Sequence, residues 1–571
     1  RQRTIHRFPA GQTGGRGTLV AMTAMFCMYW RLGALAVSAG LLFGVDLASI
    51  GAALEGMSQD LGLEDVHDTR SEWIVSGAKG GAVFGSLFGG AFMVSRGRRT
   101  SIICAAIPFL IGPLFVFAAQ SFWQAFLGRL LMGLGFGLAS VATPSYLSEV
   151  VPPVHRGLFE AMYELGIASG MLISSLLNLL LQALSESGRL GSLGCWRYQA
   201  GLVPCAFAVP LLLLALMVPE SPRWLLQTTS PSPAKLLASL KEIARLGRPG
   251  ARQRLETVKS LSNIVDGLES VQPEHEEDEE GENEKATSED DLIVLWDKKH
   301  SDVGNPLFSR ETSDYEQVAQ KQRTLSVLLQ TFVDAKDILL GKVPSARKGL
   351  LLALSAAVLN QACASTSILI YAQKLLSTVG VQTQTEQDAQ STLLIGAKLV
   401  GVIVGLFLVE TLTRRALLAT GGICSAVALG VIVLGAQLSS NEILMVGMGC
   451  FVLCFFSTWG IGYWAVVVEV TAAGGPRYAS AAQAMATATL FGTGWLTSLT
   501  FVQVMSLGSL GLLTYVCVAV LMFAYGLCWL PETSGHSLEQ CAHDVEVKAQ
   551  GCFVPSEDSE TSESSTDVEK W

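Results

Sequence analysis

Charged residues are scarce in this chain: Asp, Glu, Lys and Arg make up 15% of its 571 residues, whereas hydrophobic residues make up 50%. An average soluble domain carries about 25% charged residues. A protein this apolar, with a mean hydropathy of +0.42, has too little polar surface to stay dissolved in water. The composition therefore excludes an ordinary soluble protein and indicates one that is embedded in a membrane.

Sequence patterns that carry catalytic or metal chemistry are also missing. The twelve cysteines show neither zinc-type spacing nor a paired framework in a loop, and we interpret them as small packing residues. The apolar segments contain no nucleophile–base pair, no cluster of metal ligands and no phosphate-binding glycine loop. These absences argue against a membrane enzyme and against an ATP-driven pump. We expect no cofactor, no metal and no nucleic-acid partner.

Twelve apolar stretches each approach or exceed the ~20 residues that an α-helix needs to cross the hydrocarbon core of a bilayer. The first continues an apolar run that begins at Leu19 and has no small-residue cleavage site, so no signal peptide is predicted. We therefore expect an all-α membrane protein with twelve transmembrane helices. The predicted spans lie near residues 31–54, 73–95, 100–119, 122–148, 157–183, 197–219, 348–378, 391–413, 415–438, 442–470, 479–506 and 508–530.

The arginines between the spans indicate the orientation of the chain. They fall in the connections that follow even-numbered spans, and such basic connections face the cytoplasm in multi-pass proteins. Both termini are therefore predicted to be cytoplasmic. The arginines in question are Arg96, Arg98, Arg99, Arg156, Arg414, Arg415 and Arg477.

A long segment interrupts the pattern of spans and is predicted to be a cytoplasmic central loop. Its middle is acidic and low in complexity, and such a sequence cannot bury enough apolar surface to fold alone. We interpret the loop as a tether between two halves, with a docking site for a regulatory partner as the alternative. The predicted organisation is an N-terminal six-helix bundle at 18–219, the central loop at 220–347, a C-terminal six-helix bundle at 348–531 and a cytoplasmic tail at 532–571.

Four short motifs occur twice in the same order, at offsets of about 312–320 residues. One such match could be chance, but four in order indicate a duplicated six-span unit. Two parallel six-span halves are typical of secondary transporters, whose binding site lies between the halves near the middle of the membrane. The repeated motifs are Gly77-Ala78-Lys79 and Gly396-Ala397-Lys398, Arg98-Arg99 and Arg414-Arg415, Glu149 before Arg156 and Glu469 before Arg477, and Pro219-Glu220-Ser221 and Pro531-Glu532-Thr533.

These motifs resemble those of the sugar porter family of the major facilitator superfamily, over essentially all of the spans. Residues 219–224 match the motif PESPRW, residues 531–539 match PETxGxSLE, and Gly44-Val45-Asp46 is similar to the first-span GYD. The acidic central loop is similar to that of the tonoplast monosaccharide transporters. The resemblance implies a major facilitator fold of two pseudo-symmetric six-helix bundles, in a plasma or vacuolar membrane.

Several ionisable residues are predicted inside the membrane, where such residues are costly and by default functional. From the helical rise, Asp46 and Arg129 both lie about 10–12 Å below the outer surface, so they can pair. The resemblance implies that they form the proton-coupling pair. A static pair that only supports packing is the alternative.

The resemblance also implies a polyol site of amides, hydroxyls and one aromatic ring. Glu164 stands where the family has a glutamine, and Thr366 stands where it has an asparagine. These two departures leave the identity of the substrate open. The implied substrate-binding residues are Glu164, Asn360, Gln361, Thr366, Tyr371 and Trp464.

Lys79 and Lys398 depart from the family pattern at duplicated positions. They could bind an anionic substrate, or they could snorkel to the outer face or pair with Glu164 or Asp46.

A further set of charged residues is predicted to form a cytoplasmic gate. The alternative is that they form exposed ion pairs in loops, which contribute little to stability. The gate residues are Arg98, Arg99, Glu149, Arg156, Arg414, Arg415, Glu469 and Arg477.

The function predicted from the sequence is secondary active transport of a hexose or a related polyol by alternating access, with a proton gradient as the energy source. The expected partners are the sugar or polyol, protons and the lipid bilayer. A uniporter, a transporter of an anionic solute and a sugar sensor derived from a transporter are the alternatives.

Overall fold

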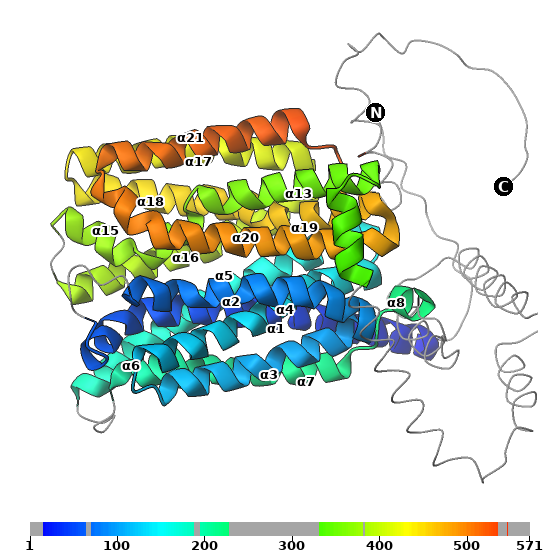
Figure 1. Cartoon of the computed structure of the whole chain (residues 1–571), viewed down its shortest axis with the longest axis horizontal. Helices are drawn as coiled ribbons and strands as arrows, with labels where there is room; N and C mark the ends of the chain where they lie inside the picture. Colours follow the sequence, from blue (N-terminus) through cyan, green and yellow to red (C-terminus); the bar gives the residue numbers. More distant parts are fainter. Residues whose placement is uncertain are drawn as a thin grey trace, which may run out of the picture.

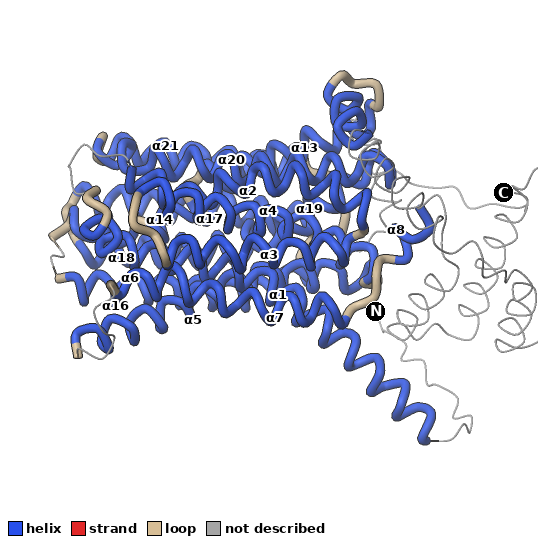
Figure 2. The backbone as a smooth tube through the Cα atoms, turned by 60° about the horizontal axis from the view of Figure 1, so that its bottom comes forward, coloured by secondary structure: helices blue, strands red, loops and turns tan. Residues whose placement is uncertain are grey.

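The computed structural model describes residues 15–63, 70–187, 194–227, 330–380, 383–534 and 545. Within these ranges every regular element is a helix (Figure 2). Most of the predicted central loop, with its acidic run and proposed regulatory docking site, lies outside the described residues, as does most of the predicted tail.

The helices form two halves that lie side by side along their length (Figure 1). The N-terminal half, blue to cyan, holds the first six predicted spans, and the sixth of these is divided into short segments. Its elements are α1 (Gly15–Asp60), α2 (Arg70–Arg96), α3 (Arg98–Phe117), α4 (Phe122–Val150), α5 (Pro153–Glu186), α6 (Cys195–Arg197), η1 (Tyr198–Leu202), α7 (Val203–Met217) and α8 (Pro222–Gln227).

The C-terminal half, green to orange in Figure 1, holds the other six spans, and three of them are divided. Its elements are α13 (Pro344–Ala362), α14 (Ser365–Ile370), α15 (Ala372–Thr378), α16 (Gln384–Thr411), α17 (Arg414–Gln437), α18 (Asn441–Phe455), η2 (Phe456–Gly460), α19 (Ile461–Thr471), η3 (Ala472–Gly474), α20 (Gly475–Ser506), α21 (Ser509–Ala524) and η4 (Tyr525–Trp529).

Ten helical segments of the described chain are long and apolar enough to cross a membrane. The remaining two of the twelve predicted spans are α2 and α20, which are rich in glycine, alanine and polar residues. These two helices pack against each other between the halves, so they bury surface that other spans would present to lipid. The arrangement agrees with twelve membrane-crossing helices.

Two helix pairs make the most extensive contacts between the halves: α2 packs against α20, and α5 packs against α16. Small residues permit the close approach, as is usual between membrane helices. A Cβ on Gly90 of α2 would lie 2.4 Å from the Cβ of Ala484 on α20, so a larger residue there would force the halves apart. The same principle acts inside the N-terminal half, where a Cβ on Gly40 of α1 would lie 2.0 Å from the Tyr163 carbonyl oxygen on α5.

Two spans of the C-terminal half change geometry near their middles. The seventh breaks between α13 and α14, where Ala364 adopts the left-handed conformation with φ of 60°. The tenth contains the π-helical segment η2 between α18 and α19. Interrupted transporter helices and π-bulges commonly mark binding sites, because they free or redirect polar groups inside the membrane.

Candidate functional site

A central cavity lies between the two halves, with about 390 Å³ of empty space when its opening to solvent is included. Both halves contribute to its wall: α1 and α5 from the N-terminal half, and the segments around both helix breaks from the C-terminal half. The structure brings five of the six predicted substrate-binding residues to this one wall. They are Glu164, Asn360, Gln361, Thr366 and Trp464.

A continuous chain of hydrogen bonds runs along the C-terminal wall of the cavity. The Lys79 ammonium donates to the Thr366 hydroxyl at 3.0 Å, and that hydroxyl donates to the Gln361 carbonyl at 3.0 Å. The Gln361 amide in turn donates to the Asn360 side-chain oxygen at 3.0 Å. Because each group is fixed by the next, the carboxamides facing the cavity are held in defined orientations.

An ion pair crosses the cavity from one half to the other. Lys398 on α16 lies 3.1 Å from the Glu164 carboxylate on α5, and the two side chains are only 1% and 6% exposed. The Trp464 indole N–H donates to the same carboxylate at 3.2 Å, and the Lys398 ammonium lies 3.9 Å from the centre of the Phe456 ring. The charge of Lys398 is therefore already matched, which weakens the prediction that this lysine binds an anionic substrate.

Tyr371 is the one predicted substrate-binding residue that the structure places away from the cavity wall. Its hydroxyl donates to the Ser498 carbonyl at 3.3 Å, and its ring stacks on Phe501. Tyr371 follows α14 directly, so the break in the seventh span turns this residue toward α20 instead of the cavity.

Asp46 and Arg129 are in direct contact, as their predicted depths suggested. The two side chains are 1% and 2% exposed, so the pair is fully inside the N-terminal half. The Arg129 guanidinium also donates to the Ile74 and Val75 carbonyls of α2, at 3.2 and 3.3 Å. One arginine on α4 thus ties the carboxylate of α1 to the backbone of α2.

The basic residues predicted to form a gate gather at one end of the bundle, which we call the basic end. In the N-terminal half, Arg98 lies 2.8 Å from Glu149, whose carboxylate also accepts the Ser221 hydroxyl at 2.5 Å. The backbone N–H of Arg99 donates to Glu220 at 2.9 Å. All these contacts stay within one half.

The C-terminal half repeats this construction with the duplicated residues. Arg414 lies 3.1 Å from Glu469, whose carboxylate accepts the Thr533 hydroxyl at 2.5 Å. The backbone N–H groups of Arg414 and Arg415 donate to Glu532 at 2.9 and 3.2 Å. The duplication seen in the sequence is therefore also a duplication of geometry.

The remaining two predicted gate residues have other surroundings. Arg477 pairs with Asp334 at 2.7 Å in the helical stretch 330–339 and is 58% exposed. Arg156 is buried, with no hydrogen-bond partner for its Nε.

Glu160, which lies near Arg156, is a residue that was not predicted from the sequence. It is fully buried, and neither carboxylate oxygen has a hydrogen-bond partner in the described structure. An acid four residues before Glu164 in an apolar span was the signal that could have found it.

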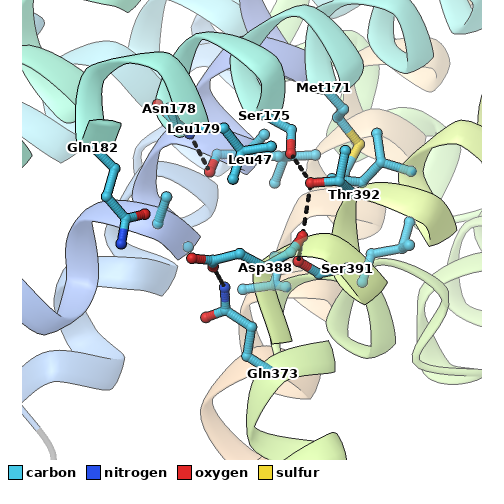
Figure 3. A pocket seen from close by; sticks show the side chains of 16 residues that line it. Leu47, Met171, Ser175, Asn178, Leu179, Gln182, Gln373, Asp388, Ser391 and Thr392 are labelled. Atoms are coloured by element: carbon cyan, nitrogen blue, oxygen red, sulfur yellow. Dashed lines mark hydrogen bonds between the residues drawn. The ribbon is translucent and has the colours of Figure 1, made fainter. Parts of the chain in front are cut away.

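A second hollow, with about 550 Å³ of empty space including its mouth, lies toward the end opposite the basic end (Figure 3). The Ser175 and Thr392 hydroxyls meet there at 2.8 Å and so join α5 to α16. Gln373 donates to Asp388 at 2.5 Å on the same wall. Leu47 borders both this hollow and the central cavity, so the two spaces are neighbours.

Comparison with known proteins gives a clear family match. A sequence profile described as "Sugar (and other) transporter" matches residues 32–263 and 305–544, which is most of the chain. The probable metabolite transport protein CsbC of Bacillus subtilis is 25% identical over 512 residues, covering 88% of this chain and 91% of its own length.

Two other relatives match over shorter segments. The galactose-proton symporter of Escherichia coli K12 is 35% identical over 204 residues, covering 36% of this chain and 40% of the symporter. The probable inositol transporter 3 of Arabidopsis thaliana is 36% identical over 198 residues, covering 34% of this chain and 32% of that protein.

Among solved structures, the proton:xylose symporter XylE bound to 6-bromo-6-deoxy-D-glucose superimposes with a TM-score of 0.67. The match covers 92% of this chain and 99% of XylE at 19% identity. An inward-open structure of XylE from E. coli gives a TM-score of 0.59. At this level of identity the likeness establishes the major facilitator fold and no more.

Proposed function

This chain belongs to the family of sugar (and other) transporters, and we propose that it carries a hexose or a related polyol across a membrane, coupled to protons. The observation that carries the proposal is the central cavity, whose wall carries polar groups from both halves. A site at such an interface opens to alternate sides when one half rocks against the other. The names of the galactose-proton symporter and the inositol transporter support this substrate class.

The cavity wall offers the groups that a polyol requires. Gln361 and Asn360 supply amide donors and acceptors, while Glu164 supplies an acceptor. The apolar face of a sugar ring would lie against the Trp464 indole, which is 5% exposed and held by its hydrogen bond to Glu164. A few fixed polar groups on a mostly apolar wall give a small-molecule site its specificity.

Asp46 is the residue that we propose to carry the coupled proton. Its carboxylate is buried against Arg129, and the same guanidinium holds two carbonyls of α2. A proton on Asp46 would remove the negative charge that Arg129 pairs with. The packing of α1, α2 and α4 would then change with each proton taken up or released.

We propose that the basic end faces the cytoplasm, in a plasma or vacuolar membrane, and that it closes through the two buried arginines. The Arg98 guanidinium approaches Ser480 of the opposite half at 3.5 Å. The Arg414 guanidinium lies 2.6 Å from the position that a Cβ on Gly157 would occupy, so it too reaches the opposite half. Within each half, the ion pairs to Glu149 and Glu469 hold these arginines in place.

The proposal is tested with the purified full chain in proteoliposomes. Uptake of radiolabelled hexoses and inositol is measured with and without an imposed pH gradient, and again for Asp46→Asn. We expect the gradient to drive accumulation in the wild type, and the variant to lose that response while it still exchanges substrate. Wild-type uptake that does not depend on the pH gradient refutes proton coupling. Competition for uptake by organic anions but not by hexoses refutes the proposed substrate class. Sugar binding without any flux would favour a sensor.

A further inference from the structure

Lys79 is a buried cation to which the transport cycle described above gives no role. Lys79 is only 3% exposed. Among the described residues, no carboxylate lies within ion-pairing distance of its ammonium. Burial of an ammonium is costly unless its donors are satisfied. All three of its donors are used, because Nζ lies 3.0 Å from the Thr366 hydroxyl, 2.7 Å from the Ser498 hydroxyl and 3.3 Å from the Gly494 carbonyl.

All three acceptors belong to the other half of the protein. Lys79 lies on α2 of the N-terminal half, whereas Thr366 lies on α14 and the other two acceptors lie on α20 of the C-terminal half. The duplicated Lys398 makes the reverse crossing, from α16 to Glu164 on α5. Each copy of the Gly-Ala-Lys motif thus places a lysine across the interface, and any motion that separates these helices must break its bonds.

The Lys79 bridge lies on the outer side of the central cavity. Lys79 is nine residues from the start of α2 at Arg70, or about 14 Å along the helix from the end opposite the basic end. Ser498 is eight residues, or about 12 Å, from the matching end of α20 at Ser506. The bridge is therefore placed to act between the cavity and the outer surface.

The same bridge reaches both the substrate wall and the proton site. Through Thr366, Lys79 is joined to the Gln361 carboxamide on the cavity wall. On the same helix, Ile74 and Val75 lie five and four residues before Lys79. Their carbonyls accept hydrogen bonds from the Arg129 guanidinium. Residues 74–79 of α2 thus connect the Asp46–Arg129 pair to the opposite half.

We propose that Lys79 is the latch that closes the outer side of the cavity and positions Gln361 while it is closed. The inference rests on the proposed transport function and adds a gating residue to it. In the outward-open state α2 and α20 separate, so the ammonium gives up all three C-terminal acceptors. Closure restores them, and the Gln361 carboxamide is then fixed toward the bound substrate.

Amide hydrogen exchange of the full chain in lipid nanodiscs tests the latch without any substrate. In Lys79→Met, which keeps the length of the side chain but removes its donors, exchange should rise at the outer ends of α2 and α20, near residues 70–79 and 495–506. Exchange at the basic end, near residues 90–98, should fall or stay unchanged. We expect Ser498→Ala, which removes one of the three acceptors, to give a smaller change in the same direction. Lys336→Met, which changes an exposed lysine in the helical stretch 330–339, is the matched control and should exchange like the wild type.

Transport measurements separate a latch from a merely structural lysine. Initial uptake by Lys79→Met should fall at least about tenfold, since each hydrogen bond to a charged group can shift an equilibrium by about that factor. Substrate affinity in nanodiscs should change much less. Wild-type exchange in both Lys79→Met and Ser498→Ala overturns the proposal, as does lost binding without a change in exchange. If Lys79→Met fails to fold, the exchange of Ser498→Ala alone decides the test. A wild type that transports no sugar would refute the proposed function, but the exchange test of the latch would remain valid.

Discussion

The ion pair between Lys398 and Glu164 permits a sharp test of how the two halves are held together. Glu164→Gln preserves the shape of the side chain and an acceptor for the Trp464 indole N–H. Lys398→Met preserves the length of the lysine and can pack its sulfur against the Phe456 ring. The two single variants and the double variant together complete a double-mutant cycle.

The expected magnitude follows from the separation and the burial of the pair. At 3.1 Å and an effective dielectric constant of about 20, the attraction is about 5 kcal/mol. Removal of one partner from a buried pair costs about 3–5 kcal/mol, because the other charge is left without compensation. Removal of both partners leaves no charge to compensate, so the double variant should be nearly as stable as the wild type.

The assay is thermal unfolding of the full chain in nanodiscs, followed by tryptophan fluorescence. Each single variant should lower the midpoint by several degrees, and the double variant should recover most of that loss. The chain contains its own control in Lys342 and Asp337, which pair at 2.7 Å while Lys342 is 62% exposed. An exposed pair is worth less than about 1 kcal/mol, so Lys342→Met and Asp337→Asn should barely interact.

The reasoning is refuted if the losses of the two buried single variants simply add in the double variant. Additivity would mean that Lys398 and Glu164 contribute independently, despite their contact. A large coupling in the exposed control pair would be equally damaging, because burial could then not be the source of the effect.

Three further predictions concern the cavity and its two ends. Gln361→Ala should raise the KM for sugar uptake about tenfold through lost hydrogen bonds, and an unchanged KM in proteoliposomes would remove this residue from the site. Thr392→Val breaks the 2.8 Å bond to Ser175 and should speed amide exchange at the end of α16 near Gln384 but not at the basic end; equal exchange at both ends would contradict this. Glu160→Leu should leave the thermal midpoint unchanged or raise it, because a buried acid without hydrogen-bond partners is replaced by an apolar side chain, whereas a fall of several degrees would show that Glu160 has a stabilising role.

The depth of a residue along a span could be predicted from the sequence, because the helical rise is constant. That constancy placed Asp46 and Arg129 at one level, and the structure joins them. The same reasoning found the repeated motifs, since a duplicated sequence produces duplicated ends such as the Glu149 and Glu469 clusters. The part that these residues play in coupling and gating stays a prediction.

The direction in which a side chain leaves its helix could not be predicted as well. The sequence left Lys79 and Lys398 with several possible environments, including the outer face, and the structure buries both at the interface of the halves. Which helix faces them depends on how the two halves dock, which no local pattern encodes. Tyr371 shows a related limit, because a break at Ala364 changes which wall the following residues face.

The two halves resemble each other at the basic end and differ around the cavity, and this contrast bears on function. At the basic end the contacts of Glu149 with Arg98 and Ser221 are repeated by those of Glu469 with Arg414 and Thr533. In the middle, the duplicated lysines meet different partners: Lys398 meets a carboxylate, whereas Lys79 meets two hydroxyls and a carbonyl. Closing one end of a transporter whose halves rock against each other needs only paired contacts that form and break together. Symmetric contacts in the two halves meet this need. Recognition of one solute needs an asymmetric wall, because a sugar has no two-fold axis to match.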